Sequence, residues 1–309
     1  MRKSITFVIF ILASIFANSQ NVYIKTFGKI TDKPIIFLHG GPGYNCVNFE
    51  ATSAKPLADK GFFVIVYDRQ GEGRNKNQKA KYTFKETFEE LNGVYEKYGI
   101  KKATLIGHSF GGVVATLFAE ANPEKIQSII LVGTPISWQG TFKNILSKSK
   151  IIYQAKNDTT NLNSISLIEK MDKASIEYSK ECLIHAEQND LFSTKNSTPE
   201  ALSIYSKLNS DTVLTKASSQ VSNEAYQVFC KNEKLTTIDL TKNLEALLKQ
   251  KVKIYGLYGK EDGLHSNEQL SELQNQIGHN NLKYFDKCSH SVFTDQQSQS
   301  IDAIKTWIK

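Results

Sequence analysis

The chain has 309 residues, with 38 Lys and Arg against 31 Asp and Glu, which gives a formal net charge of +7. This length can bury one large core and carry an insertion, and no internal repeat or Pro-rich linker separates domains. The basic excess is mostly Lys scattered among Asn, Ser and Gln, without a nucleic-acid-binding motif. The composition therefore argues against a nucleic-acid partner and for a charged, solvated surface.

Residues 1–20 have the pattern of a secretory signal peptide. Arg2 and Lys3 precede an apolar run at residues 5–16, and the small residues Ala17-Asn18-Ser19 follow it. Cleavage near residue 19 or 20 would remove both cations and lower the net charge from +7 to +5. The run is shorter than the roughly 20 residues of a spanning helix. The first cysteine, Cys46, is too distant for lipid attachment. We therefore expect an exported protein, periplasmic or secreted, with no stable membrane insertion after cleavage.

The cysteines all follow the expected leader, and an oxidising compartment would permit disulfides. By region, Cys182 could pair with Cys230, and Cys46 with Cys288. Four cysteines allow three disulfide connectivities. The sequence does not decide among these three, or between them and a state in which all four thiols are free. Cys182 and His185 have the spacing of half a metal site, but no second half follows. We expect neither a metal nor a cofactor.

Short apolar runs alternate with helical patterns along most of the chain. The predicted strands are residues 34–38, 62–67, 103–106, 126–132, 252–258 and 282–285, and the predicted helices are 82–98, 113–121, 267–277 and 293–308. Continuous apolar strands are buried on both faces, and their alternation with helices is typical of a parallel sheet. The predicted class is α/β, with a mainly parallel sheet and helices on both faces.

Residues 136–240 interrupt this alternation. They are rich in Lys, Ser, Asn and Glu, have helical and loop-like character, and follow a predicted strand. An insertion at the carboxyl end of a strand would cover the sheet's edge as a cap. We therefore divide the chain into a signal peptide at 1–20, a core at 21–135 and 241–309, and a helical cap at 136–240.

A candidate nucleophile lies at residues 105–112, Leu-Ile-Gly-His-Ser-Phe-Gly-Gly. An apolar strand runs into Gly107-His108-Ser109-Phe110-Gly111, and a helical pattern follows at once. Small flanking residues allow a sharp, strained turn that exposes the central hydroxyl at the top of the sheet. There the Phe110 N–H can face a developing oxyanion. The pattern predicts Ser109 as a catalytic nucleophile.

A serine nucleophile needs a base and a carboxylate that orients the base. Of the six histidines, His290 directly follows the last predicted strand, on a loop from which it could reach Ser109. Asp262 follows the preceding strand and stands 28 residues before His290, enough for one helix and one strand. The chain order Ser, Asp, His is that of one known hydrolase fold. Glu261 and Asp286 are the fallback carboxylates.

Two further loops follow the first two predicted strands. In His39-Gly40-Gly41-Pro42-Gly43, glycines without side chains would let backbone N–H groups approach a substrate oxygen. Gly41 is the expected second oxyanion donor beside Phe110. The sequence of residues 68–74, Asp-Arg-Gln-Gly-Glu-Gly-Arg, predicts a tight buried loop. In it we expect Asp68 and Arg69 to form local ion pairs or to cap nearby backbone groups. We expect this loop to support the site and take no part in the chemistry.

Together these loops, the elbow at Ser109, Gly259-Lys260-Glu261-Asp262 and the late His290 resemble the α/β-hydrolase fold family. The loops at 39–43 and 68–74 are similar to those of its proline iminopeptidase branch, exopeptidases that remove N-terminal residues, often proline. The match covers residues 34–135 and 250–293 and leaves the cap uncovered. It implies Ser109 as nucleophile, His290 as base, Asp262 as orienting acid, and Gly41 with Phe110 as oxyanion donors.

The chain departs from that branch at two places. Proline iminopeptidases usually carry Gly-Gly-Ser-Trp-Gly at the elbow, whereas His108 and Phe110 stand here, as in many esterases and general hydrolases. Those peptidases also place cap glutamates against the substrate's free amine. None of the cap glutamates here stands in a motif that matches, although Glu177 and Glu181 form the most regular pair; the set is Glu169, Glu177, Glu181, Glu187, Glu200, Glu224 and Glu233.

The sequence therefore predicts an exported serine hydrolase that cleaves an ester or amide through an acyl-enzyme. An iminopeptidase- or aminopeptidase-like activity on a short peptide is favoured by the loop at 39–43. A carboxylesterase acting on small acyl esters is the first alternative. A ligand-binding protein that keeps the fold without catalysis is the second, because fold does not fix function. The expected partner is a small-molecule or short-peptide substrate, and the oligomeric state is left open.

Overall fold

The computed structural model describes residues 22–308, so the predicted signal peptide at 1–20 lies outside the described residues. Within them a seven-stranded sheet has the order β1-β3-β2-β4-β5-β6-β7. β1 pairs with β3 in the antiparallel sense, and the other neighbouring strands are parallel. The strands are β1 (Ile24–Phe27), β2 (Lys33–Leu38), β3 (Phe62–Tyr67), β4 (Ala103–His108), β5 (Ile126–Val132), β6 (Lys253–Gly259) and β7 (Leu282–Phe285).

The predicted strands are confirmed to within two residues at their ends, and the predicted α/β class with them. β1 was missed. It is a four-residue edge strand with no fully buried residue, so it lacks the continuous apolar run by which the other strands were found. Its place in the sheet comes from pairing with β3, which no local pattern encodes.

The helices of the sheet-bearing part connect the strands and close the chain. They are α1 (Val47–Phe49), α2 (Lys55–Ala58), α3 (Phe84–Lys97), α4 (Phe110–Ala121), α12 (Asn267–Ile277), α13 (Val292–Asp295) and α14 (Gln297–Trp307), with a π-helical turn at Glu50–Ala54 between α1 and α2. The single helix predicted at 293–308 is two helices that meet at Gln296, whose φ of −139° is extended rather than helical.

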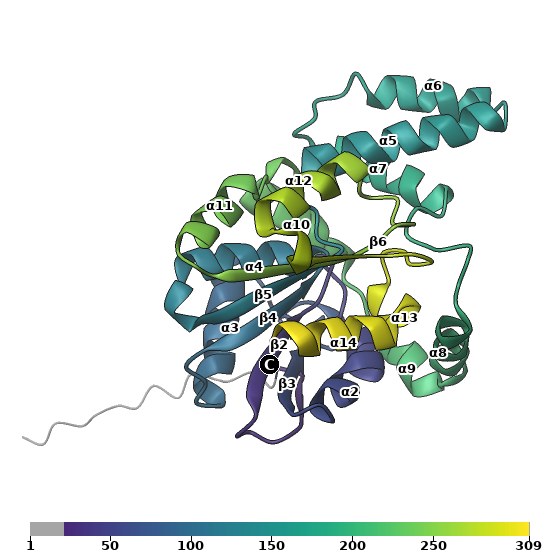
Figure 1. The fold of residues 1–309 in the computed structure, drawn as a ribbon. Coiled ribbons are helices and arrows are strands. Elements are labelled where there is room, and N and C mark those ends of the chain that lie inside the picture. The colour runs from purple at the N-terminus through teal and green to yellow at the C-terminus, as the bar shows by residue number, and fades with distance from the viewer. Residues whose placement is uncertain (1–21, 309) are drawn as a thin grey trace, which may run out of the picture.

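Two apolar layers enclose the sheet (Figure 1). On one face, α3, α4, α11 (Thr241–Lys249) and α12 pack against strand residues such as Ile36 and Leu105. On the other, α2 and α14 pack against the intervening residues, such as Ile35 and Ile106. Because successive side chains of a strand point to opposite faces, both sets must be apolar. This is why the central strands read as unbroken apolar runs.

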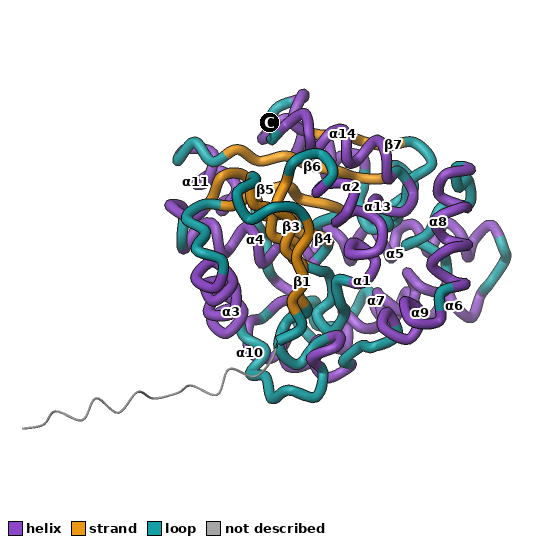
Figure 2. The backbone as a smooth tube through the Cα atoms, turned by 90° about the horizontal axis from the view of Figure 1, so that it is seen from below, coloured by secondary structure: helices purple, strands orange, loops and turns teal. Residues whose placement is uncertain are grey.

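The segment between β5 and β6 is helical. Before α11 it contains α5 (Trp138–Ala155), α6 (Thr159–Ile168), α7 (Ile176–Gln188), α8 (Pro199–Ser210), α9 (Thr212–Ser218) and α10 (Asn223–Glu233). Helices α5 to α9 lie beyond one end of the sheet in Figures 1 and 2. The two ends of the segment meet, because Leu240 N–H donates to the Ile136 carbonyl at 2.7 Å and Trp138 N–H to that of Ile238 at 3.1 Å. We keep the name cap for residues 136–240; the domain division stays a prediction.

The cysteines Cys46, Cys182, Cys230 and Cys288 are all buried free thiols in this structure, so neither suggested pairing is formed. Among residues 22–308, no helix is both long enough and apolar enough to cross a membrane.

Candidate active site

Ser109 occupies a strained turn between β4 and α4. Its φ is 52° and its ψ −122°, a conformation that non-glycine residues rarely adopt. The flanking glycines let the elements approach: a Cβ on Gly107 would lie 2.4 Å from the Gly111 carbonyl oxygen, and one on Gly111 2.0 Å from that of Leu38. The Ser109 N–H donates to the Val132 carbonyl at 2.8 Å, which ties the turn to β5. The sharp turn expected here is present, and Ser109 is partly exposed.

The structure brings Asp262 and His290 together. The two residues follow the adjacent strands β6 and β7, and Asp262 Oδ2 lies 2.8 Å from His290 Nδ1. Asp262 is only 2% exposed, and its Oδ1 accepts the Leu264 N–H at 3.0 Å. Burial alone would raise the pKa of this carboxyl, but the neighbouring His290 and His265 rings and the hydrogen bonds lower it to about 2. The carboxylate is therefore ionised at neutral pH.

The fallback carboxylates make other contacts. Glu261 accepts from the Thr194 hydroxyl at 2.6 Å and from Asn196 Nδ2 at 3.2 Å, so it faces the cap. Asp286 pairs with Lys260 Nζ at 2.8 Å on the surface. Neither is bonded to His290 in the described structure, and Asp262 remains the carboxylate assigned to it.

His108, beside Ser109, also contacts the His290 loop. Its Nε2 lies 3.0 Å from the His290 carbonyl oxygen, and the two ring centroids are 4.8 Å apart. Burial, and then the nearby His290 ring, lower the pKa of His108 to about 3, so its ring is neutral at pH 7. A neutral imidazole can donate Nε2–H to this carbonyl. The contact joins the elbow to the loop that carries the base.

Sequence analysis missed His265, which faces the same carboxylate from the other side. Its Nε2 lies 3.5 Å from Asp262 Oδ2, and its ring is buried. The signal available was its position three residues after Asp262, which one turn of irregular chain can fold back toward the carboxylate. Asp262, His265 and His290 have donor atoms within 4.8 Å of one another, as metal ligands do. Within this group Asp262 and His290 bond directly to each other at 2.8 Å.

The predicted oxyanion donors lie on either side of Ser109. Phe110 is the first residue of α4, where N–H groups have no partner within the helix. The loop at 39–43 approaches the serine at Gly40, where a Cβ would lie 3.2 Å from the Ser109 Cβ. Gly41 is the next residue, with a φ of +113° that only glycine adopts readily. The donor role of Gly41 stays a prediction.

A buried ion pair holds the loop at 39–43. Arg69 and Glu72 are each 1% exposed and pair through Nε and Oε1 at 2.9 Å. The same guanidinium donates to the His39 carbonyl at 2.7 Å and to the Gly40 carbonyl at 2.8 Å. Glu72 in turn accepts the Gly43 N–H. The loop is therefore fixed from both its ends by one pair of side chains.

Asp68 does not pair with Arg69, its neighbour in the sequence. It bonds to Arg74, whose Nε lies 2.6 Å from its Oδ2, and accepts the Cys46 N–H at 2.8 Å. Burial would raise the pKa of this carboxyl, but the hydrogen bonds and charge of Arg74 bring it to about 2. The 68–74 loop thus contains two local ion pairs, which fits the supporting role expected from the sequence.

The cap contacts both loops of the site. Ser222 N–H donates to the Gly43 carbonyl at 2.8 Å. On the other side, Asn144 Nδ2 of α5 donates to the Gly263 carbonyl at 2.9 Å, and Gly263 N–H donates to the Leu191 carbonyl at 2.7 Å. These bonds place cap residues directly over the ends of β2 and β6.

The cap residues nearest the base come from α7 and the turn after it. The Phe192 ring meets the His290 ring edge-on, with centroids 5.7 Å apart. Tyr44, beside the loop at 39–43, is 58% exposed. Partial burial, and then the charge of Glu187, raise the pKa of Tyr44. Glu187 is therefore the cap glutamate whose charge acts on Tyr44, and no sequence motif had singled it out.

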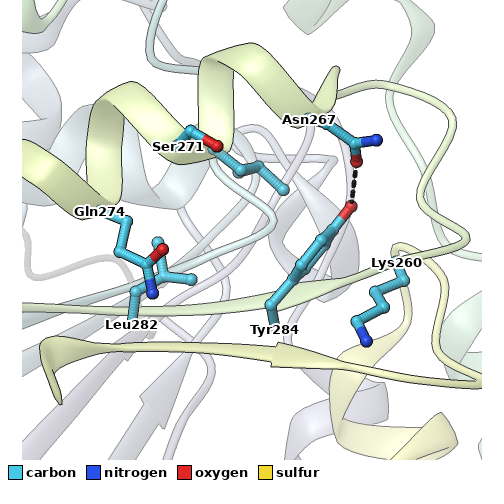
Figure 3. Close-up of a pocket in the computed structure, with 7 residues that line it drawn as sticks. Lys260, Asn267, Ser271, Gln274, Leu282 and Tyr284 are labelled. Atoms are coloured by element: carbon cyan, nitrogen blue, oxygen red, sulfur yellow. Dashed lines mark hydrogen bonds between the residues drawn. The ribbon is translucent and has the colours of Figure 1, made fainter. Parts of the chain in front are cut away.

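A separate cavity of about 520 Å³ lies between α12 and β7 (Figure 3). Its Tyr284 hydroxyl donates to Asn267 Oδ1 at 3.0 Å. It is lined by Lys260, Asn267, Leu270, Ser271, Gln274, Leu282 and Tyr284. None of these is a predicted site residue.

The geometry at the carboxyl ends of the strands agrees with sequence comparison. A profile of the family described as alpha/beta hydrolase fold matches residues 33–297. The chain belongs to the α/β-hydrolase fold family. The sheet described above, with helices on both faces, is the arrangement expected for this fold, and Ser109, Asp262 and His290 lie on loops at the ends of its strands.

Curated relatives of this hydrolase-family chain include proline iminopeptidases. The protein of that name from Lactobacillus delbrueckii subsp. bulgaricus is 35% identical over 126 residues, 38% of this chain and 42% of the relative. The one from Clostridioides difficile (strain 630) is 31% identical over 159 residues, 48% of this chain and 54% of the relative. The matches thus span about half of the relatives' length or less.

Solved structures share the α/β-hydrolase fold over most of the chain. A proline iminopeptidase-related protein from Thermus thermophilus has a TM-score of 0.67 at 22% identity and covers 92% of both chains. An esterase from Exiguobacterium antarcticum has a TM-score of 0.60 at 17% identity, covering 93% of this chain and 95% of its own. At these identities the likeness establishes the fold.

Glu72→Gln should destabilise the protein strongly. The change leaves Arg69 buried without its countercharge, which typically costs about 3–5 kcal/mol. Urea unfolding measures the loss. The control is Asp59→Asn, which breaks the exposed pair with Lys55 and should change stability by less than about 1 kcal/mol. Equal effects of the two substitutions would contradict the role given to the buried pair.

Proposed function

We propose that this protein is a serine hydrolase that cleaves an ester or amide through an acyl-enzyme. The observation that carries the proposal is the 2.8 Å contact between His290 Nδ1 and the buried, ionised Asp262, on loops beside the strained Ser109 turn. A carboxylate at this place holds the imidazole in the tautomer whose Nε2 is free to accept a proton. That is the state a serine base requires.

In the proposed reaction Ser109 Oγ attacks the substrate carbonyl while His290 Nε2 takes the hydroxyl proton. The oxyanion that forms accepts hydrogen bonds from backbone N–H groups, Phe110 on one side and Gly41 on the other. His290 then gives its proton to the leaving group, which departs and leaves an ester on Ser109. Water repeats the sequence, with His290 again as base, and releases the acid product.

Ser109→Ala and His290→Ala should each abolish labelling by a fluorophosphonate probe, which reacts only with an activated serine. Loss of either group typically lowers turnover by several orders of magnitude. Gel fluorescence of the purified protein gives the readout, and circular dichroism checks that the variants fold. A folded wild-type protein that takes up no probe would contradict the proposal and favour the ligand-binding alternative.

For the substrate, we propose a short peptide or amide with a free N-terminus. The curated relatives with this name and the similar loop at 39–43 support an aminopeptidase-like activity. An enzyme of this kind must pair the buried ammonium of its substrate with a carboxylate. We assign this role to Glu187, the cap carboxylate whose charge raises the pKa of Tyr44 beside the glycine loop.

Acetylation of the substrate's N-terminus should then lower kcat/KM by at least about thirtyfold, since truncating one partner of a buried charge pair costs about 2–5 kcal/mol. Proline p-nitroanilide and its N-acetyl form are the matched substrates. Glu187→Gln should lower kcat/KM for proline p-nitroanilide to a similar extent and leave hydrolysis of p-nitrophenyl butyrate unchanged. Glu181→Gln, on the same helix, serves as the control. Equal rates on both anilides, with faster ester cleavage, would identify a carboxylesterase instead.

We also propose that residues 1–20 direct export. The cationic start, the apolar run at 5–16 and the small residues that follow it support this. Expressed in full in a Gram-negative host, the protein should appear in the periplasm or medium with its N-terminus near residue 20, as read by mass spectrometry. Ile9→Arg should keep the uncleaved chain in the cytoplasm. Cytoplasmic, uncleaved wild-type protein would refute the proposal.

A further inference from the structure

The buried ring of His265 faces the Asp262 carboxylate. His265 is 4% exposed, and its Nε2 lies 3.5 Å from Asp262 Oδ2. This nitrogen makes no hydrogen bond of ordinary geometry in residues 22–308. Buried polar atoms normally have a partner, and a group left without one needs an explanation. The carboxylate oxygen that it faces is already bonded to His290.

We propose that His265 is a positioning residue of the catalytic site, whose Nε2–H donates to Asp262 Oδ2 after a small rotation of the ring. The inference rests on the proposed function of Ser109, Asp262 and His290. His265 touches neither substrate nor the transferred proton in this scheme. It acts by fixing the rotation of the carboxylate and by sharing its negative charge.

The surroundings of the ring favour a proton on Nε2. Burial lowers the pKa of His265, so the ring is neutral at pH 7 and carries a single proton. The negative charge of Asp262 and a hydrogen bond to the Gly133 backbone oppose this effect. With the proton on Nδ1 instead, the Nε2 lone pair would face an ionised oxygen 3.5 Å away. With the proton on Nε2 the contact is attractive instead of repulsive. A small rotation of the ring would then form the hydrogen bond to Asp262.

The elements packed on this ring each contribute a defined group. From α5, Lys148 Nζ donates to the backbone carbonyls of Asp262 and His265 at 3.4 and 3.2 Å. From β6, the Tyr258 ring meets the His265 ring edge-on at 5.1 Å. His290 and Lys148 are the neighbouring groups that oppose a positive charge on the ring. These contacts fix the position of the His265 ring, which is neutral and can donate one hydrogen bond.

The effect on the base follows from charge. Asp262 is sealed from water, so only protein donors can offset its negative charge: Leu264 N–H at Oδ1, and the two imidazoles at Oδ2. Without the His265 donor the carboxylate keeps more of its negative charge beside the imidazole. The serine would then be activated only in a more alkaline range.

The test compares three substitutions in the full-length mature protein. His265→Phe keeps the ring shape without a donor, His265→Gln places an amide N–H near the position of Nε2, and His265→Asn is polar but too short to reach. His279→Gln, at a histidine outside the site, is the control. The readout is the second-order rate of fluorophosphonate labelling between pH 5 and 9, which needs no knowledge of the substrate.

For His265→Phe and His265→Asn we expect the acid limb of the profile to move up by about half a pH unit or more, with a plateau about tenfold lower. His265→Gln should restore most of the difference, and His279→Gln should match wild type. A purely structural role would lower the plateau without moving the limb. Profiles of the Phe and Asn variants that superimpose on that of wild type after scaling would overturn the inference, and Asn still decides if Phe fails to fold.

Proton NMR of the inactive Ser109→Ala protein separates this inference from the proposed function. The His290 Nδ1–H bonded to Asp262 should give a strongly downfield resonance, whether or not Ser109 reacts. Adding His265→Phe should shift that resonance, and adding His265→Gln should return it toward its original position. An unmoved resonance overturns the role of His265. Absent labelling of wild type, with the resonance moving as expected, overturns only the proposed chemistry at Ser109.

Discussion

The site depends above all on the buried ion pair between Arg69 and Glu72. Two charges removed from water are stable only when their hydrogen-bonding capacity is used, and here it is used on the glycine loop. Arg69 binds the carbonyls of His39 and Gly40, and Glu72 binds the N–H of Gly43. The Arg69 Cζ also lies 5.2 Å from the centre of the Phe110 ring. One pair of side chains thus supports both sides of the predicted oxyanion hole.

This arrangement explains why a loop so rich in glycine can serve as a rigid part of a site. Glycine brings the backbone close to Ser109 but is the residue with most conformational freedom to lose. The lost freedom must be offset by contacts, and His39 is the loop residue whose side chain supplies one, by accepting the Arg69 N–H at 3.1 Å. The other contacts come from outside, from the 68–74 loop and from Ser222 of the cap.

The sequence predicted those parts of the candidate site that a short stretch of neighbouring residues determines. The turn at Ser109 has its glycines within two residues, and Asp262 and His290 each follow an apolar strand, so both pattern and position identified them. The partners of Arg69 and Asp68 were not predictable in the same way: Arg69 pairs with Glu72 and Asp68 with Arg74, and only the fold of the loop decides between neighbouring charges. β1 and the break at Gln296 were missed for the same reason, since pairing and packing set them.

The places of His265 and Glu187 in the candidate site could not be predicted from the sequence. No motif marks either residue in the sequence, yet His265 faces the Asp262 carboxylate and the charge of Glu187 acts on Tyr44 beside the glycine loop. Their positions are set by the cap, whose helix α5 holds the 262–265 turn through Asn144 and Lys148. A cap bonded in this way to the 262–265 turn, and through Ser222 to the glycine loop, cannot move away without breaking hydrogen bonds to both. If the proposed function holds, a substitution in the cap should therefore affect both the substrate pocket and the alignment of Ser109, Asp262 and His290.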